Sequence, residues 1–171
     1  MMVLYLRKNN MKTLLILLFT FFSISNLNAQ TIESPDFKSA DDQTTKILKI
    51  ERNAKFTVVT FEHTNDEGAW ITLNSGIYIQ DADGQAMFKF IKAENIPLMP
   101  EKYHFKKHET KTFKVYFEKI PTQIKSVNII ERAVPRDEPV SYLNFFGVKL
   151  DKSGTGKTYK EMVFEKAALV Y

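Results

Sequence analysis

The stretch TKTFKVYFEKIPTQIKSVNIIE, residues 110–131, decides the fold of this 171-residue chain. Its first half alternates apolar with polar side chains: Phe113, Val115 and Phe117 against Lys114, Tyr116 and Glu118. This period of two predicts a strand with one buried face. Pro121 has no N–H to donate and ends that strand, and a second β-rich run follows over 124–131. Two neighbouring strands of this kind need a facing sheet, because each must bury its apolar side.

Short strand-like segments, separated by turn residues, precede and follow this stretch. They cover residues 47–51, 56–63, 69–73, 77–80, 86–91, 103–106 and 141–150. Roughly nine short strands at a spacing of about 8–12 residues are typical of a two-layer sandwich. We therefore predict an all-β fold over residues 46–150, an immunoglobulin-like antiparallel β-sandwich of about 7–9 strands. In its last strand, Phe146, Val148 and Leu150 should share one face.

The segments on either side of the predicted sandwich differ from it in composition. Residues 30–45 are polar with few apolar side chains and are predicted to be a linker. Residues 151–171 form a tail of uncertain structure, in which 159–170 contain good helix formers. We expect a short C-terminal helix there, with a final strand as the alternative. The tail is also a candidate to cover Leu143 and Phe145, which alternation places on the opposite face of the last strand.

The first 29 residues have the organisation of a secretory signal peptide. A charged start at residues 11–13 precedes the apolar run 14–22, which is too short to span a bilayer, and small and polar residues follow. We expect cleavage after Ala29, with Met11 as the candidate start; an uncleaved anchor is the alternative. The chain is therefore expected to be exported, to the periplasm or outside the cell, with no membrane span after cleavage.

Charge and cysteine content exclude several functions. The chain has 24 Lys and Arg against 20 Asp and Glu, but three of the basic residues and none of the acidic ones precede the expected cleavage site. The mature part therefore has 21 basic against 20 acidic residues, and this balance does not favour a nucleic-acid partner. No cysteine is present, which excludes disulfides, thiolate metal sites and thiol catalysis.

Residues 153–158 (SGTGKT) match the end of a phosphate-binding loop. The full pattern needs a glycine at the position of Asp151, and a carboxylate there would face the phosphate oxygens. We therefore predict a solvated loop, with no nucleotide partner and no cofactor.

Asp81, Asp83 and Gly84 match the end of a calcium-loop pattern. Ile79 and Ile91 occupy the positions of the first and last expected ligands, and an apolar side chain cannot bind calcium. An Asp-Gly hairpin turn explains these residues, with weak calcium binding as the alternative.

His63, His104 and His108 are the only histidines. His104 and His108 are four residues apart, which is a metal spacing only on a helix, whereas a strand end is predicted here. We expect all three to be polar surface residues, and we predict no metal site and no catalytic residue. A histidine with a serine or carboxylate partner stays open as an alternative, although no motif with diagnostic catalytic spacing appears.

Lysines are concentrated around the central stretch, at positions 102, 106, 107, 111, 114, 119 and 125. On alternating strands, the side chains expected to point outward together are those of His104, Lys106, Lys114 and Tyr116. These four are the candidate binding residues, for an anionic ligand such as an acidic glycan or a lipid headgroup. The alternative is a solvated face whose lysines prevent strand-to-strand aggregation. Trp70 is expected to pack in the core of the opposite sheet.

Several blocks of the sequence occur in an order that resembles a known domain. They are Trp70, Tyr78, Asp83-Gly84, Ile96-Pro97, Phe113-x-Val115-x-Phe117, Ile120-Pro121, Ile129-Ile130-Glu131 and Phe145-Phe146-Gly147-Val148-Lys149-Leu150. Over residues 47–150 the chain resembles an uncharacterised immunoglobulin-like β-sandwich domain of exported bacterial proteins. The resemblance implies a sandwich and an exported location, and it brings no catalytic residues.

These observations favour an exported, non-enzymatic binding or interaction module of the bacterial cell envelope, which contacts a protein or another envelope component. The alternatives are a small envelope hydrolase or metal-dependent enzyme, and a subunit of a larger assembly. A concave pocket with one of the three histidines beside a carboxylate would favour the enzyme. A flat or convex surface without that convergence would favour the module.

Overall fold

The computed structural model describes residues 30–133 and 141–168, so the predicted signal peptide lies outside the described residues. Within these ranges the chain forms eleven strands and one helix. They are β1 (Gln30–Glu33), β2 (Ser39–Ala40), β3 (Thr45–Arg52), β4 (Phe56–Asn65), β5 (Trp70–Ile71), β6 (Tyr78–Asp81), β7 (Met87–Glu94), β8 (Tyr103–His104), β9 (Glu109–Glu118), β10 (Ser126–Ile130), β11 (Phe145–Lys149) and α2 (Tyr159–Ala168). The predicted all-β class is confirmed.

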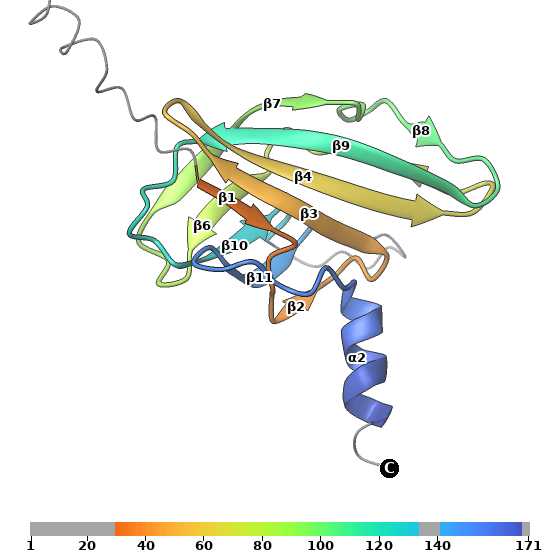
Figure 1. Cartoon of the computed structure of the whole chain (residues 1–171). Helices are drawn as coiled ribbons and strands as arrows, with labels where there is room; N and C mark the ends of the chain where they lie inside the picture. The colour runs from red at the N-terminus through yellow and green to blue at the C-terminus, as the bar shows by residue number, and fades with distance from the viewer. Residues whose placement is uncertain (1–29, 134–140, 169–171) are drawn as a thin grey trace, which may run out of the picture.

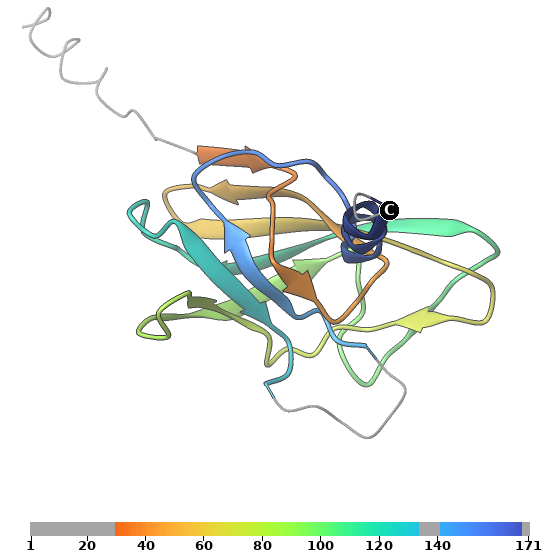
Figure 2. The same ribbon diagram turned by 90° about the horizontal axis from the view of Figure 1, so that it is seen from below.

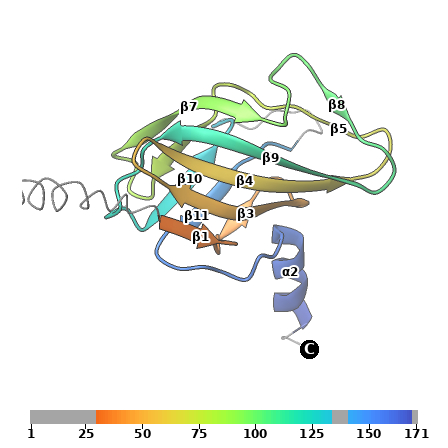
Figure 3. The same ribbon diagram turned by 45° about the horizontal axis from the view of Figure 1, so that its top comes forward.

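Nine of the strands form one antiparallel sheet that folds over on itself, in the order β1-β3-β4-β9-β7-β6-β10-β11-β2. The sheet folds at β7, because the first residues of β7 pair with β6 and residues 90–94 pair with β9. The part β1-β3-β4-β9 therefore faces the part β6-β10-β11-β2 as a second layer (Figure 1 and Figure 2). The predicted two-layer sandwich is confirmed, and a two-stranded ribbon, β5-β8, lies at one end of it (Figure 3).

The core lies between the layers and is built on the β4-β9 pair. Phe61 of β4 lies opposite Phe113 of β9, and their rings stack at a centroid distance of 5.3 Å. Phe61 also lies 5.8 Å from Phe145 in the opposite layer. Phe113, Val115 and Phe117 are fully buried, as their alternation with polar residues predicts.

One charged side chain, Arg52 at the end of β3, is buried between the layers and is only 2 % exposed. Its guanidinium donates to the carbonyls of Pro121 at 3.1 Å and Ile124 at 3.0 Å. It also donates to the Leu150 carbonyl at 3.0 Å and to the side-chain oxygen of Gln30. Burial lowers the pKa of Arg52, because the charge is removed from water. Arg52 thus joins β1, β3, the β9–β10 connection and the end of β11.

A bulge in β11 changes which of its side chains face the core. Val148 pairs with Val127 and Phe145 with Ile129, so β11 has one more residue than β10 over this stretch. Gly147 lies within the bulge with a φ of +66°, which glycine adopts without the strain that a Cβ would cause.

Because of this bulge, Phe145 and Val148 are both buried, whereas Phe146 is only half-buried. The expectation that Phe146 lies on the buried face of the strand is therefore wrong. Phe145 packs against the rings of Phe37 and Phe61 at 5.1 and 5.8 Å. Side chains of the core therefore cover Phe145, while the helix of the tail packs Tyr159 and Met162, both partly buried, against the core.

Residues 30–45 belong to the sandwich rather than to the linker that their composition predicts. Ile32 of β1 and Ala40 of β2 are buried, and Phe37 between them packs edge-on against Phe145. β1 and β2 are short and lie at the two ends of the sheet order. They therefore bury few side chains each, and the segment looks polar in sequence.

The outer edge of β1 is covered at its last residue, Glu33, by the segment that follows β11. The Glu33 N–H donates to the Ser153 hydroxyl oxygen at 3.1 Å, and the Gly154 N–H donates to the Glu33 carbonyl at 3.0 Å. The backbone of Glu33 is therefore occupied on the side that β3 does not cover.

The predicted C-terminal helix is confirmed as α2, and it begins with a capping box. The Thr158 N–H donates to Glu161 Oε2 at 2.6 Å, and the Glu161 N–H donates to Thr158 Oγ1 at 3.2 Å. α2 projects from the sandwich (Figure 1), with Val163 and Phe164 exposed. Over the described ranges, no helix is both long and apolar enough to cross a membrane.

Candidate ligand-binding pocket

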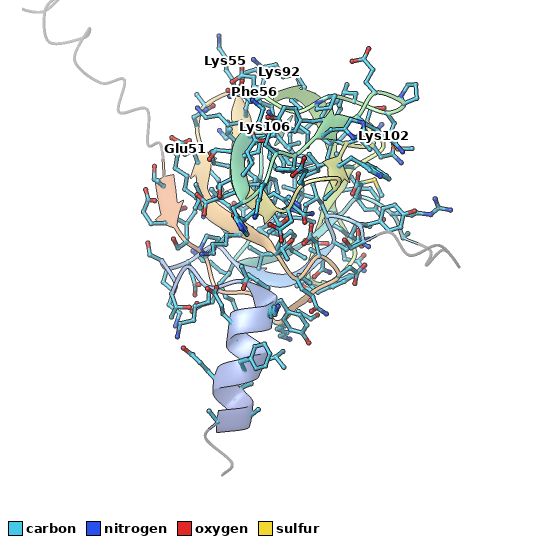
Figure 4. All side chains as sticks on the ribbon, turned by 90° about the vertical axis from the view of Figure 1, so that its right-hand side faces the viewer. Glu51, Lys55, Phe56, Lys92, Lys102 and Lys106 are labelled. Atoms are coloured by element: carbon cyan, nitrogen blue, oxygen red, sulfur yellow. The ribbon has the colours of Figure 1, made fainter. Side chains whose placement is uncertain are left out.

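A pocket of about 640 Å³ opens at the end of the sandwich where β4 ends. Its walls come from the β2–β3 connection, the end of β4, the neighbourhood of β5 and β8, and the segments after β10 and before β11. These segments meet because the loops of a sandwich gather at its two ends. Figure 4 looks onto this end of the molecule, where Lys102 is labelled. The volume is within the range of small-molecule sites, about 300–1,000 Å³.

Asp42 lines the pocket and is held by its own loop. Its Oδ1 accepts the N–H groups of Thr44 at 2.8 Å and Thr45 at 3.2 Å. Its Oδ2 accepts the Thr45 hydroxyl at 2.7 Å and lies 3.2 Å from His63 Nδ1. Burial alone would raise the pKa of Asp42, but the hydrogen bonds from His63, Thr44 and Thr45 lower it to about 2. Asp42 is therefore ionised at neutral pH although it is buried.

His63 lies on the inward face of β4 and is 5 % exposed. Its Nδ1 is 2.7 Å from Thr45 Oγ1 and 3.2 Å from Asp42 Oδ2, and its Nε2 is 3.2 Å from the amide nitrogen of Asn65. An amide nitrogen can only donate, so Nε2 accepts and the ring proton sits on Nδ1. The expected surface position of His63 is wrong, because the β4 alternation turns it to the same side as Phe61.

Glu131 follows β10 and joins two other segments of the pocket. Its Oε1 accepts the Asn74 N–H and its Oε2 accepts the Leu143 N–H, both at 2.8 Å. Burial raises the pKa of Glu131, and the nearby charge of Asp42 adds to this, while the two backbone hydrogen bonds act in the opposite direction. Glu131 therefore holds the loop after β5 against the segment before β11.

Four large side chains of the lining that are at least partly exposed, Trp70, Met99, Lys102 and Tyr142, form what we call the aromatic rim. The Lys102 ammonium lies 3.7 Å from the centre of the Trp70 ring. The Arg132 guanidinium, beside the pocket, lies 5.5 Å from the Tyr142 ring. Both are cation–π contacts. The expectation that Trp70 packs in the core is wrong, because β5 belongs to the ribbon at the end of the sandwich.

The structure divides the four predicted binding residues into two pairs. Lys114 and Tyr116 lie side by side on the outer face of β9, and the Tyr116 hydroxyl donates to Glu94 Oε2 at 3.0 Å. His104 belongs to β8 and Lys106 to the turn after it, and both are exposed. None of the four lines the pocket. Anion binding by these residues stays a prediction.

The SGTGKT segment makes contacts within the protein. The Lys157 ammonium lies 2.6 Å from both carboxylate oxygens of Glu165, and Thr158 caps α2. The Thr155 N–H donates to Asp36 Oδ1 at 3.0 Å. These donors are therefore engaged by protein carboxylates in this structure.

The Asp-Gly segment forms the predicted hairpin turn between β6 and β7. Asp81 Oδ1 accepts the Ala86 N–H at 2.9 Å, and the Gly84 N–H donates to the Asp81 carbonyl at 3.1 Å. Gly84 has a φ of +74°, which such turns require. In residues 30–133 and 141–168, no group of three or more His, Cys, Asp and Glu side chains could hold a metal ion.

Sequence reasoning did not find Asp42, Glu131, Ser141 or Tyr142 as pocket residues. For Asp42 a local signal exists, since an aspartate followed by Thr44 and Thr45 favours a turn closed by its own side chain. For Glu131 the signal is weaker: it is an acidic residue directly after a buried apolar strand. Neither pattern indicates that the two carboxylates share a pocket.

Fold and pocket together define an all-β sandwich protein with a small-molecule-sized pocket at one loop end. No protein-family model matches the chain, and no curated protein or solved structure is significantly similar to it.

Proposed function

We propose that the protein is an exported, non-enzymatic binding module whose pocket takes a small ligand. The observation that carries this proposal is the state of the three buried ionisable groups in the pocket, Asp42, His63 and Glu131. Asp42 and Glu131 have a protein donor on each carboxylate oxygen, and His63 has a partner on each ring nitrogen. A general base needs a lone pair that faces the substrate, whereas groups that are held by protein donors in this way are suited to holding the pocket's shape.

The exported location is supported by the leader and by the way the domain is stabilised. An exported chain without cysteine depends on its core, and here two layers bury apolar side chains along most of their length. The bacterial envelope as the place of action rests on the resemblance described above.

A small hydrolase is the second candidate, because a concave pocket with a histidine beside a carboxylate is the arrangement set out above as favouring an enzyme, and His63 and Asp42 provide it. Asp42 is positioned to orient the His63 ring, which is the arrangement that activates nucleophiles in hydrolases. For this function, His63 Nε2 would have to be released from Asn65.

Trp70 is the only tryptophan in the sequence, so its fluorescence reports on the pocket alone. A fragment library is screened by this fluorescence and by ligand-observed NMR. We expect hits whose binding is lost in Trp70→Ala and kept in Tyr116→Ala, a control on the outer face of β9. A screen without hits that depend on Trp70 would contradict the binding function.

The hydrolase is tested in parallel with p-nitrophenyl esters and His63→Gln. We expect the wild type and His63→Gln to be equally inactive. The hydrolase would replace the binding module if the wild type hydrolyses the esters and His63→Gln does not, while circular dichroism shows that the variant keeps its fold.

A further inference from the structure

We propose that the pocket ligand is a neutral saccharide, an inference that rests on the proposed binding function. The first argument is charge. The pocket lining carries charges of both signs, because Asp42 and Glu131 are acidic and Lys102 is basic. Each oxygen of the two carboxylates already accepts a hydrogen bond from a protein donor. A buried cationic ligand would find no free anion here, and an anionic one would find only Lys102, which is exposed to water at the rim, so this lining favours a neutral ligand.

The second argument is the flat apolar surface at the aromatic rim. Trp70 is half-exposed, and the side chains of Ile71 and Leu143 continue an apolar wall into the pocket. A sugar ring has an apolar C–H face and hydroxyl edges, so one face can pack on an indole ring while its edges reach polar groups. Lys102 covers the Trp70 ring at 3.7 Å and is exposed, so it can move aside when a ring stacks there.

The third argument is the type of polar group beside this surface. Asn65, Thr72 and Ser141 line the pocket, and their amide and hydroxyl groups can both donate and accept. Sugar hydroxyls have the same dual capacity. The Thr72 hydroxyl makes only a long contact of 3.5 Å to the Pro97 carbonyl, so it can exchange this contact for a ligand hydroxyl.

The test uses the chain as exported by a bacterial host, with three related disaccharides as probes. They are neutral N,N′-diacetylchitobiose, its deacetylated cationic form, and an acidic disaccharide that contains glucuronate. Trp70 fluorescence and isothermal calorimetry measure binding. We expect saturable binding of the neutral probe only.

Variants at the rim distinguish stacking from charge recognition. Trp70→Ala should weaken binding of the neutral probe roughly tenfold or more, the loss expected for one aromatic stacking partner. Lys102→Met should leave the affinity unchanged or improve it, because it uncovers the ring without removing a hydrogen bond to the ligand. Tyr116→Ala should have no effect.

Three outcomes overturn the inference and leave the binding function standing. In the first, the protein prefers the acidic probe and loses that binding in Lys102→Met. In the second, it prefers the cationic probe. In the third, it binds none of the probes, although the fragment screen yields Trp70-dependent hits. If the probes and the screen both fail, the inference and the binding function fall together.

Discussion

Asp42 is the residue on which the hydrogen bonds of the pocket converge. Two backbone N–H groups, two threonine hydroxyls and a histidine ring surround one buried carboxylate. Hydrogen bonds to the charged form of an acid stabilise that form even where water is excluded. Its charge therefore contributes to stability, and this contribution depends on pH.

Asp42→Asn tests that contribution. The folded pKa of about 2 lies below the ordinary value of 3.8, so the carboxylate stabilises the fold above about pH 4, and this is lost as the pH falls through about 2. A shift of this size corresponds to about 2 kcal/mol. We expect Asp42→Asn to be less stable than wild type by about that amount at pH 7, and the difference to shrink towards pH 2.

Urea denaturation between pH 7 and pH 2.5 measures this difference. The matched control is Asp66→Asn, which changes an exposed carboxylate paired with His108 at 2.8 Å and should shift stability by no more than about 0.5 kcal/mol. A gap between wild type and Asp42→Asn that stays constant with pH would contradict the assignment.

At the residue scale, alternation within a strand predicts which side chains are buried only where both neighbours of a residue also belong to a regular strand. It placed Phe117 inward and Tyr116 outward correctly. Alternation also turns His63 inward, two residues after Phe61, but its surface position was expected from polarity, and burial of a polar residue depends on partners elsewhere in the chain. For His63 those partners are Asp42, Thr45 and Asn65. Trp70 lies in the two-residue strand β5, where alternation gives no prediction.

Among the elements, β9 and β11 show what the sequence pattern does and does not determine. β9 pairs without interruption with β4 over ten residues, so its period of two persists. β11 contains a bulge, and a bulge adds one residue and so exchanges inward for outward positions. Gly147 marks the bulge in sequence, but a glycine alone does not show that the strand continues past it.

Phe117→Ala tests the register of β9. Phe117 is fully buried, and its truncation should cost about 3–5 kcal/mol of unfolding free energy. Tyr116→Ala, one residue earlier and on the outer face, should cost less, because Tyr116 is half-exposed. Urea denaturation of both variants checks this order, and equal losses would show that the register is wrong.

For the molecule as a whole, the two layers are joined at opposite ends by different polar groups. At one end, Arg52 of β3 donates to carbonyls of the β9–β10 connection and of Leu150, which follows β11 in the other layer. At the other end, Glu131 and the Asp42–His63 pair hold the loops. The sandwich class follows from many short strands at regular spacing. The pocket does not, because segments as distant as Asp42 and Tyr142 meet there and no local pattern encodes that meeting.

Arg52→Met tests the role of the buried arginine. The substitution keeps an unbranched side chain but leaves the carbonyls of Pro121, Ile124 and Leu150 without this donor. We expect a loss of about 2–4 kcal/mol in unfolding free energy, within one cooperative transition. Lys49→Met, which removes an outer-face ion pair with Glu51, should cost at most about 1 kcal/mol. Equal and small losses in calorimetry or urea denaturation would contradict this role.

The coverage of β1 by Ser153 and Gly154 has a consequence for how this protein behaves at high concentration. A strand with unoccupied amides can recruit a neighbouring chain and start templated polymerisation. Here β1, at one end of the sheet order, contacts Ser153 and Gly154 on the side that β3 does not cover. The strand at the other end, β2, is only two residues long. Neither end of the sheet order therefore offers a long free edge to a second chain, and concentrated solutions should stay clear of fibrils.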